Sequence, residues 1–264
     1  MCMRSAFILL VLFFSTHFSG SEQNNIALEG FAISNPLRVT QVDGDAPASI
    51  RIINGSSLKQ LPAVVRDLSA AFKGSIFREG FLLDKNGFAV YLYDMTCNSL
   101  VNSAAVKYKP GDTIYKLGLN RLNHDAADNA LAATIIHELM HCVLLDIYKR
   151  AKNEDEKALT TIIGFGPNGK DTSGFFKDDF FSLVNSGDEG QHELIYRLFY
   201  KQMVSILECF AEIHKEVFLD HKDAESLMWS GLQETGAYKK LSDEDKREIG
   251  STILQAKGIN IEEY

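Results

Sequence analysis

The segment HELMH at residues 137–141 carries two histidines and a glutamate at a spacing that suits metal-assisted hydrolysis. Residues four apart lie one above the other on a helix, so the imidazoles of His137 and His141 can bind one cation. Glu138 is rotated by about 100° from His137, because a helix turns once in about 3.6 residues. Its carboxylate therefore lies beside the cation, where it can take a proton from a water that the cation activates.

The neighbours of this motif predict that the helix is buried. They are apolar on nearly every side: Ile135, Ile136, Leu139, Met140, Val143 and Leu144. Polar side chains in such a helix need partners, because an unpaired buried charge costs on the order of several kcal/mol. A zinc ion would satisfy them, so we predict a Zn2+ site with Glu138 as the catalytic general base. The alternative is that the motif holds a structural zinc ion or none.

A catalytic zinc ion uses three protein ligands and one open position, so a third ligand must come from elsewhere in the chain. The metzincin spacing would place a histidine six residues after His141, but position 147 is isoleucine, which excludes that class. His192 shares its helical face with the apolar residues that follow it, so it points towards the core and is the leading candidate. The alternatives later in the chain are Glu189, Glu193, Glu208, Glu212, His214 and His221, of which Glu208 and Glu212 lie away from the apolar face.

Tyr196 lies one helical turn beyond His192 and could take part in the reaction. We predict that its hydroxyl donates a hydrogen bond to the oxyanion of the tetrahedral intermediate, a type of contact that strongly accelerates acyl transfer. The alternative is a tyrosine whose ring packs in the core and whose hydroxyl is satisfied there. The sequence leaves both interpretations of Tyr196 open.

Strands are predicted ahead of the motif and helices after it. The Asn86-Gly87 pair favours a tight hairpin turn between two short strands. The expected elements of this half are strands at 49–53, 81–83, 88–93 and 113–119 and an amphipathic helix at 57–73.

The metal-binding helix is predicted over 126–149, with Asp125 as its cap, and a long irregular segment that could include a short helix follows at 151–190. Further helices are expected over 191–218, 223–233 and 243–256, the last capped by Ser242. The fold class is therefore α+β, with a small mixed or antiparallel sheet packed on long helices and a mostly helical C-terminal half.

Composition narrows the partners and the compartment. The net charge of −8 gives no basic excess, so no nucleic-acid partner is expected. Residues 1–21 have the layout of a signal peptide, which predicts a secreted or periplasmic protein whose single domain spans 22–264 and has no stable membrane insertion after leader cleavage. The cysteines that remain, Cys97, Cys142 and Cys209, include no CxxC pair, so a disulfide framework is not expected.

With the motif, the helix TIIHELMH and the segment QHELIYRLF, the chain resembles the zincin metallopeptidases, and more narrowly the SprT-like and related secreted zinc metallopeptidases of bacteria. The segment SLMWSGLQETGAY at 226–238 is also similar to secreted members of such families, without an assigned chemistry. The resemblance implies a zincin-like fold in which an edge strand, expected at 113–119, aligns the substrate. The chain lacks the cysteine zinc ribbon and basic region common among SprT-like proteins that act on DNA-bound substrates, so that role is not carried over.

These features together predict a secreted zinc-dependent endopeptidase that acts on a protein or peptide. His137, His141 and His192 would hold the metal, and Glu138 would serve as general base and then as proton donor. The alternative is a secreted binding or effector protein with a structural or vestigial zinc site. An effector whose peptidase attacks one specific protein is a further possibility, and the oligomeric state is open.

Overall fold

The computed structural model describes residues 50–74, 88–96, 104–107, 114–120, 126–156, 158–159, 173–215 and 219–258. Contacts divide the chain into two units, Met1–Gln41 and Val42–Tyr264, and every described element belongs to the second unit. The predicted leader at 1–21 and the predicted strand at 81–83 lie outside the described residues.

The strands form one four-stranded sheet in the order β1-β2-β4-β3. β1 (Ile50–Asn54), β2 (Phe88–Met95) and β4 (Ile114–Asn120) are parallel, and β3 (Ala104–Lys107) pairs antiparallel with β4. The sheet is therefore mixed, and the α+β class with a mostly helical C-terminal half is confirmed. The inner strands carry runs of buried apolar residues, as expected of parallel strands covered on both faces.

Three predictions for the sheet need correction. The 88–93 strand is not one arm of a hairpin, because β1 and β4 occupy both of its edges between Ala89 and Leu92. The 113–119 strand corresponds to β4, which is an inner strand and not the edge. The edge strands are β1 and β3, and β3, of four residues, is a further strand that was not predicted because its short AAVK run lacks a clear strand pattern.

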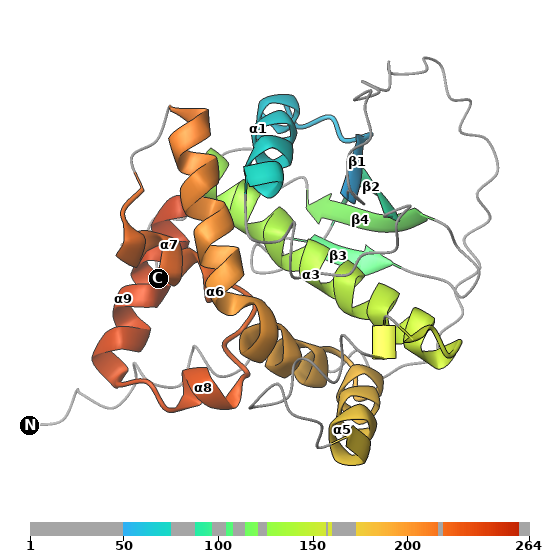
Figure 1. Cartoon of the computed structure of the whole chain (residues 1–264). Coiled ribbons are helices and arrows are strands. Elements are labelled where there is room, and N and C mark those ends of the chain that lie inside the picture. Colours follow the sequence, from blue (N-terminus) through green and yellow to red (C-terminus); the bar gives the residue numbers. More distant parts are fainter. Residues whose placement is uncertain are drawn as a thin grey trace, which may run out of the picture. The chain divides into compact units, whose positions relative to one another are not determined.

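The central helix is α3 (Asp128–Lys152), close to the predicted 126–149. Seventeen of its residues are buried, including His137 and His141, as the apolar surroundings of the motif predicted. Among the described residues it is the one helix long and apolar enough to cross a membrane, and 83% of its most apolar window is buried inside the protein. A buried core helix of a globular protein can be equally long and apolar, so length and composition alone do not indicate a membrane span. Figure 1 shows α3 running along the β3 side of the sheet, and the two elements are in contact.

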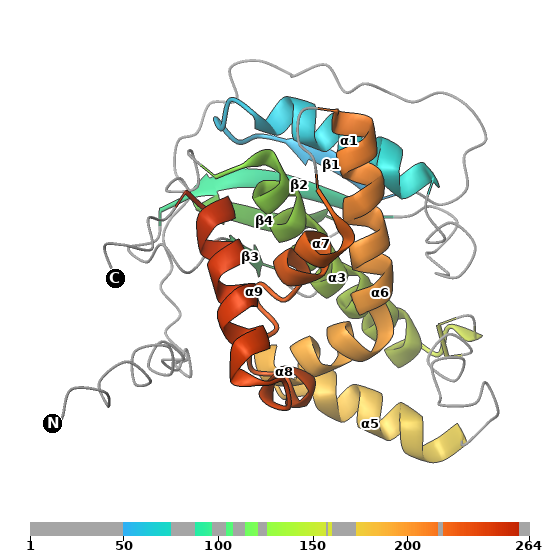
Figure 2. The same cartoon turned by 90° about the vertical axis from the view of Figure 1, so that its left-hand side faces the viewer.

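Helix α6 (Asp188–His214) packs across α3 and brings the first turn of one helix to the middle of the other. It begins three residues before the predicted start, because the first turn already carries acidic residues that favour the positive end of the helix dipole. It also contacts α1 (Leu61–Gly74) and α5 (Ser173–Asn185), which lies within the segment predicted to be irregular. In the view of Figure 2, α6 runs from α1 at the top of the picture down towards α5 at the bottom.

Helix α1 starts at Leu61 and not at the predicted residue 57. The segment before it, residues 54–57, is bound to the sheet: the hydroxyls of Ser56 and Ser57 and the backbone N–H of Ser57 donate to the Asp94 carboxylate at the end of β2. They therefore join the loop to the sheet and do not cap the helix.

The C-terminal helices are α7 (His221–Met228), α8 (Gly236–Lys239) and α9 (Asp243–Ala256). The predicted cap of α9 is confirmed, since Ser242 accepts a hydrogen bond from the backbone N–H of Asp245 at 3.1 Å. The backbone N–H of Ala127 donates to the carbonyl of Ala256 at 2.8 Å, which joins the start of α3 to the end of α9. This bond satisfies a donor at the start of the helix, where the N-cap residue Ala127 makes no side-chain cap bond. The predicted cap, Asp125, lies outside the described residues.

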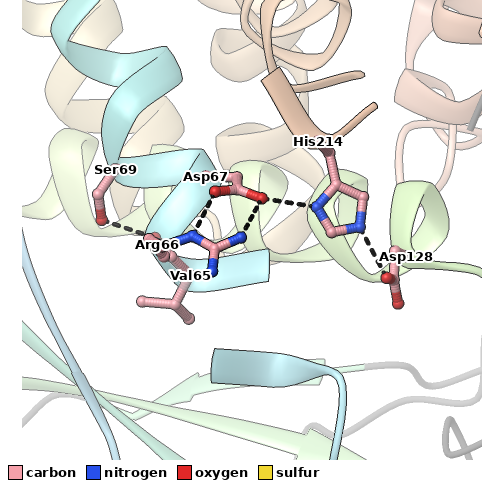
Figure 3. A network of polar contacts seen from close by, with 6 residues as sticks. All are labelled: Val65, Arg66, Asp67, Ser69, Asp128 and His214. Carbon is pink, nitrogen blue, oxygen red and sulfur yellow. Dashed lines mark hydrogen bonds and ion pairs between the residues drawn. The ribbon is translucent and has the colours of Figure 1, made fainter. Parts of the chain in front are cut away.

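A buried histidine joins three of the helices, as Figure 3 shows. His214 of α6 contacts Asp67 of α1 through Nδ1 at 2.7 Å and Asp128 of α3 through Nε2 at 2.8 Å. Arg66 donates to both oxygens of the Asp67 carboxylate, and one of these, Oδ2, is also the oxygen that contacts His214. Because carboxylates only accept when ionised, both ring nitrogens of His214 donate and the ring is an imidazolium. We call His214, Asp67 and Asp128 the histidine clamp.

Candidate metal centre

Three imidazoles meet where the first turn of α6 crosses the middle of α3. The Nε2 atom of His137 lies 3.3 Å from Nε2 of His141 and 3.3 Å from Nε2 of His192. The rings are arranged like a propeller, with centroids 5.0–5.1 Å apart and planes inclined by 60–62°. The structure therefore brings together the three residues predicted as ligands, from positions 55 residues apart in the chain. We call them the histidine triad.

The triad fits a tetrahedral metal ion. Zinc–nitrogen bonds of about 2.0–2.1 Å at tetrahedral angles place two ligand nitrogens about 3.3–3.4 Å apart. The distances from the His137 nitrogen match that spacing. Imidazole nitrogens suit zinc and other late first-row transition metals, so the donor set agrees with the predicted zinc and also accepts its neighbours in that series.

The electrostatic surroundings keep the triad neutral. Burial lowers the pKa of His137 well below its ordinary value, and the other two histidines and Lys257 lower it further. Burial and the charge of His141 lower the pKa of His192 to about 4. Burial also lowers the pKa of His141, although its contact with Gln191 opposes the shift. Neutral imidazoles have free lone pairs, so the triad is ready to bind a cation at neutral pH.

Glu138 lies on the neighbouring face of α3 and is half-buried. Burial and the nearby negative charge of Asp188 raise its pKa to about 8. A raised carboxyl pKa is typical of functional sites as well as of structural networks. Glu138 is not among the three converging ligand residues, which agrees with a position beside the metal.

Gln191 fixes the orientation of one ligand. Its Oε1 lies 2.8 Å from Nδ1 of His141, and its Nε2 donates to the carbonyl of Val184 at 3.3 Å. An amide oxygen accepts, so Nδ1 of His141 carries the proton and Nε2 faces the other imidazoles. Outer partners of this kind set the tautomer of a metal-bound histidine. The sequence analysis missed this role, although Gln191 directly precedes His192.

The loop between α7 and α8 packs against another ligand. A Cβ atom at Gly231 would lie 2.8 Å from Cε1 and 3.0 Å from Nε2 of His137, so only glycine fits there. Gly231 also has φ +89°, a backbone conformation that side chains disfavour. Its N–H donates to Oε1 of Gln233 at 3.0 Å. The segment at 226–238, which had no assigned chemistry, thus contributes a wall of the metal site.

Tyr196 packs in an aromatic cluster. Its ring stacks on Trp229 with centroids 5.1 Å apart and an angle of 20°, and Tyr200 lies at 5.3 Å on the same helix. The ring position agrees with the packing alternative for this residue, while the oxyanion-binding role of its hydroxyl stays a prediction.

The other candidate ligands lie elsewhere. Glu193 receives hydrogen bonds from Arg197 and from the backbone N–H of Gly236. His214 belongs to the histidine clamp, and His221 contacts Glu208 at 2.6 Å. Among the described residues the group that could hold a metal ion is the triad alone. Cys142 and Cys209 are free thiols, and Cys97 lies outside the described residues.

Comparisons with family models, with curated proteins and with solved structures found no match to this chain. The resemblance to zincins therefore rests on the residues of the motif and on nothing from a known relative. What can be concluded about activity depends on the metal centre itself.

Proposed function

We propose that this protein is a zinc-dependent peptidase, as the motif predicts. The observation that carries the proposal is the convergence of His137, His141 and His192 at zinc-binding distances, with Glu138 on the adjacent face of the same helix. Two histidines four apart occur in many helices. A third imidazole arriving from another helix with matching geometry is a much stronger indication of a metal site.

A catalytic site also needs a coordination position free of protein. Structural zinc sites are closed by four protein ligands, whereas catalytic sites keep three. Within the described residues no fourth histidine, cysteine or carboxylate joins the triad. This supports a catalytic site over the alternative of a secreted binding or effector protein with a structural or vestigial zinc site.

Glu138 would move the protons. A bound zinc ion supplies Lewis acidity, which polarises the substrate carbonyl and lowers the pKa of a water in the site. The pKa of Glu138 falls when a cation lies beside it, because the opposite charge favours the carboxylate. Glu138 then accepts a proton from the attacking water and donates it to the leaving amine nitrogen.

Strand β3 would align the substrate backbone. It is one of the two edge strands of the sheet and contacts α3, which carries the motif. Among the described residues no further strand pairs with its outer edge, which offers backbone donors and acceptors to which an extended peptide can add. We therefore assign to β3 the substrate-aligning role that was predicted for 113–119. The proposed substrate is a protein or peptide, which the enzyme would cleave as an endopeptidase. A secreted or periplasmic location is part of this proposal and rests on residues 1–21.

The decisive test replaces Glu138 by Gln and measures zinc content and peptide cleavage separately. We expect the variant to retain one zinc ion per chain and to lose about a hundredfold or more of the hydrolysis rate. Glu212→Gln on the exposed face of α6 is the matched control and should behave as wild type. Full activity in Glu138→Gln, or a zinc-loaded wild type that cleaves no peptide in a random library, would contradict the proposal.

A further inference from the structure

Asp188 places a carboxylate beside the metal centre. It lies in the first turn of α6 and is exposed. It precedes Gln191 by three residues and His192 by four, so it lies on the helix face that carries both residues. Asp188 thus belongs to the surface next to the triad, one turn nearer the start of the helix.

The negative charge of Asp188 reaches groups on both helices of the site. Burial sets the direction of the pKa shift at Glu138, His141 and His192, and the charge of Asp188 acts on all three. Glu189, the next residue, is equally exposed but is rotated by about 100° from Asp188 on the helix, away from the face that carries Gln191 and His192. Of this acidic pair, Asp188 is therefore the residue on the side of the triad.

Asp188 is available to a ligand. Among the described residues no lysine, arginine or hydrogen-bond donor pairs with its carboxylate. A second negative charge, that of Glu234, acts on His192 from the loop between α7 and α8. The site thus has negative charge on the side where α6 begins, in a chain whose net charge is −8.

We infer that Asp188 is a specificity-determining residue that selects peptides with a lysine or arginine next to the cleaved bond. This inference rests on the proposed peptidase function. A cationic side chain bound on the Asp188 side of the triad gains an ion pair, and an acidic side chain at the same place is repelled. Asp188 itself does not touch the reacting atoms.

The expected effect follows from the exposure of the carboxylate. Exposed ion pairs correspond to about a twofold to fivefold change in an equilibrium constant. Asp188→Asn should therefore reduce the preference for lysine over glutamate peptides by about that factor, and Asp188→Lys should invert it. The preference should also weaken at high salt, because exposed charges are screened.

The experiment compares full-length zinc-loaded protein on peptides identical except for lysine, glutamine or glutamate at each position around the cleaved bond. The readout is the ratio of kcat/KM values between peptides. A loss of folded protein lowers both values by the same factor, so it leaves the ratio unchanged. Glu189→Gln is the control, since it removes a first-turn charge of the same helix. The inference predicts a lysine preference in wild type and in Glu189→Gln, reduced in Asp188→Asn. Equal ratios in wild type and Asp188→Asn would overturn it.

A second readout separates this inference from the peptidase proposal. The same peptides are titrated into zinc-loaded Glu138→Gln, with and without Asp188→Asn, and binding is followed by fluorescence anisotropy. If no peptide is cleaved but the charge preference in binding depends on Asp188, the peptidase proposal fails and the charge selection stands. If peptides are cleaved without a preference that depends on Asp188, the charge selection fails and the peptidase stands.

Discussion

The protein buries histidines in two places, and the two places are opposite in chemistry. In the histidine triad, imidazole nitrogens face one another, and burial holds the pKa of each ring below its ordinary value. In the histidine clamp, burial alone would lower the pKa of His214, but the hydrogen bonds and charges of Asp67 and Asp128 outweigh it and the pKa is raised. The triad presents neutral nitrogen donors that can bind a cation, whereas in the clamp the His214 ring itself carries the positive charge.

The difference shows how burial alone does not assign a role to a histidine. His214 and His192 lie on the same helix and near the same apolar face, so their sequence environments are similar. What separates them is the nature of the groups that other helices bring to them: carboxylates at His214 and imidazoles at His192. Removing one partner from a buried imidazolium–carboxylate cluster destabilises the fold, whereas neutral imidazoles that converge on one point can bind a metal ion.

The largest expected effect is on metal binding. Zinc binding free energies of about 10–16 kcal/mol are shared among four bonds, so His192→Ala should cost about 2.5–4 kcal/mol, or roughly a hundredfold to a thousandfold in affinity. The unfolding free energy of the metal-free protein should change little, because none of the described residues forms an ion pair with His192 that its removal would leave unpaired. Competition with a chromophoric chelator measures the affinity. A His192→Ala variant that binds zinc as wild type does would remove the distinction between the two clusters.

The next largest expected effect is on the free energy of unfolding and comes from the histidine clamp. His214→Ala leaves the Asp67 carboxylate buried without one of its partners, which should lower the unfolding free energy by about 3 kcal/mol while zinc affinity stays the same. The folded pKa of His214 lies above the ordinary 6.5, so the clamp contributes fully below about pH 6.5 and less as pH rises through the folded value. Urea unfolding of the metal-free protein from mildly acidic to alkaline pH measures this.

The difference between wild type and His214→Ala should therefore shrink as the pH rises. His221→Ala is the control, because His221 contacts Glu208 and Glu225 at the surface and its removal should have a small effect. A difference that grows with pH would contradict an imidazolium at His214.

The smallest of these expected effects concerns the loop that packs against the triad at His137. Gly231→Ala places a methyl group against the His137 ring at a backbone conformation that costs about 1–2 kcal/mol in a residue with a side chain. We expect about a tenfold loss of zinc affinity, measured by the same competition. Gly250→Ala in α9 meets open space and should leave zinc affinity unchanged. Equal affinities in the two variants would mean that the loop does not support His137.

Local pattern was enough to predict much of this arrangement. The spacing of His137 and His141, the apolar stripe around His192 and the Ser242 cap of α9 depend on neighbours in the sequence, and the structure agrees with each. The fold class followed from the order of strands and helices.

Relations between distant segments could not be predicted in the same way. β3 is too short to carry a periodic signal, and the order of the strands depends on pairings that no local pattern encodes. Gln191 and Gly231 have roles only because α6 and the loop after α7 meet α3. The clamp is a similar case, since His214 and its two carboxylates come from three helices.

X-ray absorption spectroscopy at the zinc edge tests the central claim most directly. The purified protein, loaded with one zinc ion per chain, should give three histidine nitrogens at about 2.0–2.1 Å and one further light atom from solvent. His192→Ala should lose one imidazole contribution, and His214→Ala should keep all three. A spectrum with four protein ligands, with sulfur in the first shell, or unchanged by His192→Ala would contradict the account.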